Sequence, residues 1–255
     1  MIKAVFFDVD GTLVSFIDHK VPDSARKAIA ELRKRGMLCF LATGRHLLEL
    51  EEMACYDIVF DGYVTTNGQI CLDQDHNVIW RLPFKEKTRR AMAEIFNKKE
   101  VPLLFIEEGR MYHNIIDQRV IDAYGILGTT IPEVGEYTGA PVYQACTYIK
   151  EGEVDYKTKF PEGLNFMWWH NNAIDILESE GKIVGIEHMC ELYDLKKSEI
   201  MAFGDAENDR AMLEHVGTAI AMGNADEDIK KLADHVTASV EDDGIYKALV
   251  HYGLL

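Results

Sequence analysis

The sequence has no long apolar run and no excess of positive charge. No apolar stretch approaches the ~20 residues that a membrane-spanning helix needs, so we expect no such helix. The 43 acidic residues outnumber the 27 basic ones, and the net charge of −16 argues against nucleic acid and anionic membranes as partners. The amino-terminal residues read as a strand rather than as a charged segment followed by an apolar one, so we expect no signal peptide.

Cysteine is scarce and has no pattern typical of a metal or redox site. None of the five cysteines stands in a CxxC spacing, and four of them lie inside apolar or helical patterns. We therefore expect reduced thiols in the core of a cytoplasmic protein. The five are Cys39, Cys55, Cys71, Cys146 and Cys190.

The 255 residues suffice for one large domain or two modest ones. Strand and helix patterns alternate at both ends of the chain, which predicts a Rossmann-like α/β core with a parallel sheet. Between them the pattern changes to helices followed by antiparallel-looking strands, typical of an α+β unit. We predict a core of residues 1–83 and 182–255, with residues 84–181 inserted as a second domain.

The first strand, an apolar run over Ala4–Phe7, leads directly into Asp8 and Asp10. Ligands bind at the carboxyl ends of strands in open α/β sheets, and a turn there could bring both carboxylates to one site. Their repulsion is tolerable if a cation lies between them or one is protonated. The stretch thus indicates a Mg²⁺ site with an aspartate free to attack a substrate. The alternative is a surface turn, since Asp and Gly are common turn residues.

Two further apolar runs end in residues suited to phosphate or metal. Thr43-Gly44-Arg45 follows one run, and Gly204–Asp209 follows another. The Thr43 hydroxyl and a nearby N–H could bind phosphate at a helix N-terminus, although a Thr there is usually a helix cap. Arg45 could reach phosphate or the second domain, or it could be a solvated cation.

These motifs in this order resemble those of the haloacid dehalogenase-like phosphatases, namely DxDGTL, ATGR, a lysine and GDxxND. Together with Thr65–Gly68 and Ala221–Ala225, the pattern is similar to the Cof-type branch of bacterial sugar-phosphate phosphatases, which carry a large mobile cap. The resemblance runs almost end to end and is strongest in the predicted core.

The resemblance implies a role for each aspartate of the first motif. Asp8 would be the nucleophile that forms an aspartyl-phosphate and a metal ligand. Asp10 would be the general acid and then the base, and its backbone carbonyl would be a metal ligand. The spacing of the two residues alone does not distinguish these roles.

The remaining motifs supply charge and further ligands. Asp205, directly after a strand, is the best second metal ligand, and Asp209 would bind the metal, a metal-bound water or the lysine. Asn208 would donate to phosphate, although GDxxND could instead be an ordinary helix start. Lys182 is favoured as the cation because it begins a helix where the core resumes, but its neighbours depart from the Ser and Gly usual in the family. The competitors are Lys157, Lys159, Lys196 and Lys197.

In the inserted domain, Trp169 and His170 stand in an aromatic and polar run that could recognise a sugar ring. The alternative is that alternate members of the run are core. The resemblance implies that this cap closes over the site and selects the substrate.

The sequence thus predicts a Mg²⁺-dependent hydrolase of small phosphate monoesters, with hexose phosphates favoured by resemblance. The alternatives are a phosphomutase, a phosphatase of phosphoglycolate or a cofactor phosphate, and a non-catalytic regulator that binds a phosphorylated metabolite.

Overall fold

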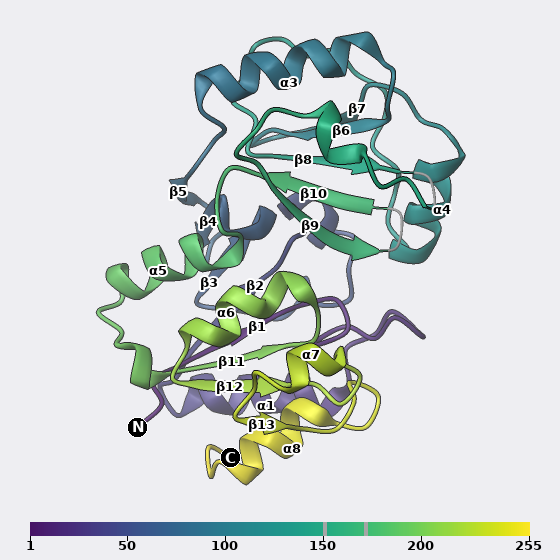
Figure 1. Cartoon of the computed structure of the whole chain (residues 1–255). Coiled ribbons are helices and arrows are strands. Elements are labelled where there is room, and N and C mark those ends of the chain that lie inside the picture. Colours follow the sequence, from purple (N-terminus) through teal and green to yellow (C-terminus); the bar gives the residue numbers. More distant parts are fainter. Residues whose placement is uncertain (150–151, 171–172) are drawn as a thin grey trace. The chain divides into compact units, whose positions relative to one another are not determined.

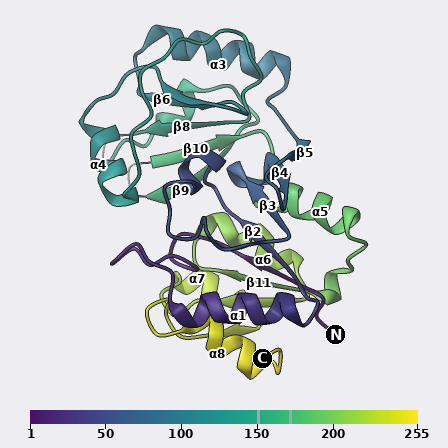
Figure 2. The same cartoon turned by 180° about the vertical axis from the view of Figure 1, so that it is seen from behind.

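The computed structural model describes residues 1–149, 152–170 and 173–255 (Figures 1 and 2). The chain forms two compact units, which are Met1–Trp80 with Gly181–Leu255, and Arg81–Glu180. The observed boundaries fall after residues 80 and 180. The first predicted boundary, after residue 83, lies three residues later, and the second, after residue 181, lies one residue later.

The first unit contains an eight-stranded sheet in the order β13-β12-β11-β1-β2-β3-β4-β5. The strands from β13 to β3 are parallel, and β4 pairs antiparallel with β3. The chain leaves β1 toward β2 on one side, and β11 later fills the other side, so the strand order reverses at β1. This is where α/β sheets bind ligands. The strands are β1 (Ala4–Phe7), β2 (Leu38–Ala42), β3 (Gly62–Thr65), β4 (Ile70–Asp73), β5 (Val78–Arg81), β11 (Ile200–Gly204), β12 (Thr218–Ala221) and β13 (His235–Val236).

Helices cover both faces of this sheet, which explains why its central strands are apolar throughout. Figures 1 and 2 show α1 and α8 on one face and α5, α6 and α7 on the other. Phe6 stacks on Phe40 with ring centroids 4.8 Å apart, and Phe7 stacks on Phe203 at 5.4 Å. The helices are α1 (Asp23–Lys34), α2 (Leu47–Leu50), α5 (Lys182–Leu192), α6 (Arg210–His215), α7 (Glu227–Lys230) and α8 (Gly244–His251).

The second unit contains a five-stranded antiparallel sheet in the order β7-β6-β8-β10-β9. Alternate residues of β6 join different clusters: Phe105 packs with α3, and Leu104 packs with α4. The two helices therefore cover opposite faces. The elements are α3 (Glu86–Lys98), β6 (Leu103–Ile106), β7 (Met111–His113), α4 (Gln118–Leu127), β8 (Gln144–Tyr148), β9 (Asn165–His170) and β10 (Ala173–Leu177).

The predicted fold class, a parallel-sheet α/β core with an α+β insertion, is confirmed. All five cysteines are buried free thiols, as predicted, and burial raises the pKa of Cys39 to about 12. In the described part of the chain, no helix is both long and apolar enough to cross a membrane.

One buried histidine, His113, is a candidate for acid sensitivity in the second unit. The ring of His113 lies 2.9 Å from the carbonyl oxygen of Pro132 through Nδ1 and 3.1 Å from the Tyr148 hydroxyl through Nε2. A carbonyl oxygen only accepts, so Nδ1 carries the proton and Nε2 accepts from Tyr148. Protonation of Nε2 would place a positive charge in this buried site and would remove the acceptor of the Tyr148 hydroxyl. Burial accordingly lowers the pKa of His113 from 6.5 to about 4.

We predict that His113 costs stability as the pH falls. The unfolded chain takes up the proton near pH 6.5 and the folded chain near pH 4, so the neutral histidine stabilises above this window, and up to about 3 kcal/mol is lost across it. Thermal unfolding of wild type and His113→Gln between pH 7.5 and 4 checks this, with exposed His19→Gln as the control. The difference in Tm between wild type and His113→Gln should shrink with acid. A difference that does not vary with pH contradicts the assignment.

Candidate active site

The predicted site residues follow three adjacent strands at one edge of the first unit's sheet. Asp8 follows β1, Asp205 follows β11 on one side, and Thr43 follows β2 on the other. These strands are parallel, so their carboxyl ends meet at the same edge. The topology alone thus gathers motifs that are almost 200 residues apart in the chain.

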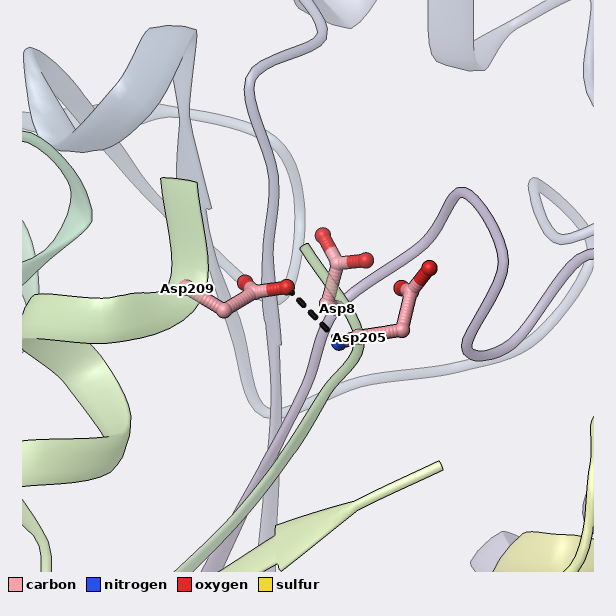
Figure 3. Close-up of side chains that lie close together, drawn as sticks. All are labelled: Asp8, Asp205 and Asp209. Carbon is pink, nitrogen blue, oxygen red and sulfur yellow. Dashed lines mark hydrogen bonds between the residues drawn. The ribbon is translucent and has the colours of Figure 1, made fainter. Parts of the chain in front are cut away.

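Three carboxylates form a buried cluster at this edge. Oxygen atoms of Asp8, Asp205 and Asp209 all lie within 4.8 Å of one another. The three residues are 4%, 8% and 0% exposed, respectively. Figure 3 shows them side by side, two from the ends of β1 and β11 and the third from the helical turn after β11.

Lys182 supplies a positive charge to this cluster. Its Nζ lies 2.5 Å from Asp8 Oδ1 and 2.6 Å from Asp209 Oδ1, and its side chain is fully buried. Lys182 is the first residue of α5, preceded by Gly181 in a left-handed conformation (φ 85°). Among the lysines considered from the sequence, Lys182 is the one that contacts the nucleophile candidate.

The cluster carries more negative charge than the lysine balances. Burial, together with the charge of Asp209, raises the pKa of Asp8 to about 7, although Lys182 opposes this effect. Burial and the charge of Asp8 likewise raise the pKa of Asp205 well above its ordinary value. Burial alone would lower the pKa of Lys182, but the charges of Asp209 and Asp8 outweigh it and raise the pKa.

The donor set therefore fits a hard divalent cation. Three ionised carboxylates and one ammonium leave two negative charges, which a divalent ion would balance. All candidate ligands are oxygen atoms, as Mg²⁺ prefers. Asp8 and Asp205 are the best placed, because the two oxygens of Asp209 are already engaged.

Backbone and hydroxyl donors fix the orientation of the cluster. Asp209 Oδ2 accepts the N–H groups of Asp205 (3.0 Å) and Ala206 (3.2 Å), while Oδ1 holds Lys182. Asp209 therefore supports the lysine and the loop, one of the roles expected for it. Thr12 Oγ1 donates to Asp205 Oδ1 at 2.8 Å. This role of Thr12 is not among those that the sequence predicts, although Thr12 stands inside the first motif.

Asp10 lies outside the carboxylate cluster and pairs with Arg45. Two guanidinium nitrogens of Arg45 contact the two Asp10 oxygens at 2.9 and 2.8 Å. Arg45 also lies 3.3 Å from Glu49 through Nη1. The sequence predicts that Arg45 could reach phosphate or the cap, and in the structure its guanidinium contacts the general-acid candidate. Glu49 carries no motif signal, and only its position four residues after Arg45 could have indicated it.

Thr43 and Gly44 lie in a loop that a strained turn supports. The Thr43 carbonyl accepts the N–H of Asn67 at 3.0 Å, and a methyl group on Gly44 would lie 3.1 Å from the Asn67 amide nitrogen. Thr66 and Asn67 both have left-handed backbones (φ 53° and 48°). Such a conformation is costly for a β-branched residue. The Thr66 hydroxyl is fully buried and has no hydrogen-bond partner within the described residues.

The other predicted residues are less closely tied to the cluster. Asn208 is half-buried in the turn between Asp205 and Asp209. Trp169 packs against the apolar cluster beside α4, which agrees with the alternative that it is core. The side chain of His170 lies outside the described residues.

A parallel α/β sheet with a buried acidic cluster and a lysine at its carboxyl edge is the arrangement of a phosphoryl-transfer enzyme. Comparison with known proteins gives the family. The family model of haloacid dehalogenase-like hydrolases matches residues 5–249, and the chain belongs to this family. It is an enzyme of the phosphatase type that acts on small phosphorylated substrates.

Three relatives illustrate the range of the family. YkrA of Bacillus subtilis (strain 168), named for a presumed phosphatase activity, is 33% identical over 99% of this chain and 98% of its own. The solved structure of BT4131, a sugar phosphatase of subclass IIB, superposes with a TM-score of 0.86 at 34% identity, over 99% of this chain and 100% of its own. YcsE of Bacillus subtilis (strain 168), a 5-amino-6-(5-phospho-D-ribitylamino)uracil phosphatase, is 25% identical over 99% of this chain and 96% of its own.

If the cluster holds a divalent cation, Mg²⁺ should stabilise the folded protein. At about 100 times its Kd, a ligand adds roughly 2.7 kcal/mol, which is on the order of 5–10 °C in Tm for a protein of this size. Thermal unfolding with and without Mg²⁺ measures the shift. Asp205→Asn should lose most of it, whereas Asp57→Asn, an exposed aspartate paired with Arg26, should retain it. Equal shifts in all three proteins would place the cation elsewhere.

Proposed function

We propose that this protein is a Mg²⁺-dependent phosphatase that hydrolyses small phosphate monoesters, with hexose phosphates as the favoured class, through an aspartyl-phosphate on Asp8. The observation that carries the proposal is the contact of Lys182 with Asp8 inside the carboxylate cluster. It provides a nucleophile, a fixed positive charge and ligands for a divalent cation at one point.

In the first half of the reaction, a carboxylate oxygen of Asp8 attacks phosphorus. The Asp8 O–P bond forms as the bond from phosphorus to the leaving oxygen breaks, and Asp10 gives a proton to that oxygen. Lys182, bound to Asp8 Oδ1, lies where it can also neutralise the phosphoryl oxygens. Thr43, Gly44 and Asn208 would donate further hydrogen bonds to these oxygens.

In the second half, water attacks the phosphorus of the aspartyl-phosphate while Asp10 takes up the proton from that water. The Asp8 O–P bond breaks, and inorganic phosphate leaves with both residues restored. A Mg²⁺ ion would be held by Asp8, Asp205 and the backbone carbonyl of Asp10, with Asp209 as a further ligand or as the holder of a metal-bound water. The ion would supply positive charge to the phosphoryl group. Positive charge at the site matters because the protein as a whole carries −16.

The preference for hexose phosphates is supported by the sugar phosphatase of subclass IIB, which aligns over 99% of this chain. The second unit, residues 81–180, is proposed as the cap that selects the substrate. The relative that acts on a ribitylamino-uracil phosphate favours the alternative of another small phosphorylated metabolite. The five buried free thiols support a cytoplasmic location.

We predict that phosphate release from a hexose-phosphate panel requires Mg²⁺ and Asp8. Asp8→Asn should lower turnover by at least about a thousandfold, because an amide is a poor nucleophile. Asp57→Asn removes the same charge at an exposed site and should retain turnover. The panel should include an aryl phosphate and a ribitylamino-uracil phosphate. Turnover that persists in Asp8→Asn would show that the nucleophile is wrong, and binding without turnover would favour a regulator.

A further inference from the structure

We propose that Arg45, itself held by Glu49, is a positioning residue that sets the Asp10 carboxylate for proton transfer. This inference rests on the proposed function, in which Asp10 carries the proton to and from the reacting oxygens. Arg45 does not need to touch the substrate for this role. It acts by fixing where the Asp10 oxygens lie.

The contact between Arg45 and Asp10 has the geometry that fixes a carboxylate plane. Arg45 Nε lies 2.9 Å from Asp10 Oδ2, and Nη2 lies 2.8 Å from Oδ1. Two parallel bonds remove the rotation that a single bond would allow. Asp10 needs such support because its side chain is 26% exposed, whereas that of Arg45 is only 6% exposed. A buried guanidinium thus holds a carboxylate that solvent reaches.

Arg45 is in turn held at both ends. Its Nη1 contacts Glu49 Oε1 at 3.3 Å, and Glu49 Oε2 accepts the backbone N–H of His46 at 3.0 Å. The backbone N–H of Arg45 donates to the Thr43 hydroxyl at 3.1 Å, and its carbonyl accepts the N–H of Thr66 at 2.9 Å. The start of α2 therefore positions the guanidinium, and the guanidinium positions Asp10.

This arrangement suits both halves of the reaction. When Asp10 is ionised, both oxygens accept from Arg45, and lone pairs remain to take a proton from water. When Asp10 is protonated, one oxygen stays bound to Arg45 while the other offers its proton to the leaving oxygen. A misplaced Asp10 would therefore slow the reaction most for substrates whose leaving oxygen needs a proton. An alkoxide leaving group needs it, and a nitrophenolate does not.

The leaving group therefore provides the test. The experiment measures kcat/KM on a hexose phosphate and on nitrophenyl phosphate. This quantity is chosen because it covers all steps up to cleavage of the ester bond. Arg45→Ala should lower kcat/KM for the hexose phosphate by about a hundredfold. The loss on the nitrophenyl ester should be less than about fivefold, because that reaction needs no general acid. Arg45→Lys and Glu49→Gln should also lower the ratio of kcat/KM on the hexose phosphate to kcat/KM on the nitrophenyl ester, but by a smaller factor than Arg45→Ala.

Arg33 provides a matched control. It forms the same two-bond pair with Asp61, at 3.1 and 3.0 Å, on the same unit but on α1. Arg33→Ala should leave the ratio of the two kcat/KM values unchanged. If Arg45→Ala does not fold, Arg45→Lys keeps the charge and removes the fork of donors, so the test still stands.

A double variant separates positioning from a general structural effect. Asp10→Ala should reproduce the loss on the hexose phosphate, and adding Arg45→Ala should cost less than about threefold more, because residues that act as a unit are not additive. Equal losses on both esters, or losses that multiply in the double variant, would overturn the proposal. An Asp10→Ala variant that keeps the wild-type ratio would contradict the proposed function itself, and the Arg45 proposal would fall with it.

Discussion

The structure of the site depends on one buried ammonium group between two carboxylates. Lys182 joins Asp8 at the end of β1 to Asp209 in the turn after β11, and all three side chains are almost fully shielded from water. Removing one partner of such a group leaves a buried charge without compensation, which typically costs 3–5 kcal/mol. The ends of two strands and the start of α5 are therefore fixed relative to one another by charge as well as by packing.

The backbone around this group is shaped to allow the contacts. Gly68 has a left-handed backbone (φ 85°), and a methyl group on it would lie 2.7 Å from the carbonyl oxygen of Gly181. The turn that carries Thr66 and Asn67 thus packs directly against the residue before Lys182 while it hydrogen-bonds to the Thr43 loop. Strain of this kind persists only where the surroundings determine it. The turn links the phosphate-loop candidates to the lysine.

Much of this arrangement could be predicted from the sequence, because apolar runs identify buried strands and strand ends identify the active edge. The positions of Asp8, Thr43 and Asp205 follow from that rule. The partners of Arg45 could not be predicted, because they depend on how the chain turns after β2. The extents of α2 and α7 could not be predicted closely, because each spans only four residues and such short helices are ended by capping and turns rather than by periodicity. The role of Trp169 depends on packing that the sequence pattern does not resolve.

The most direct test of this account is to locate the phosphoryl group during turnover. The protein is mixed with a radiolabelled phosphate ester, quenched in acid within a single turnover, digested and mapped by mass spectrometry. We expect the label on the peptide that contains Asp8, in a linkage that hydroxylamine cleaves. With nitrophenyl phosphate as the ester, we expect a larger amount of label in Asp10→Asn, because water then attacks the aspartyl-phosphate with no base to take its proton. Label on another residue, or turnover with no labelled protein at any quench time, would contradict the central claim.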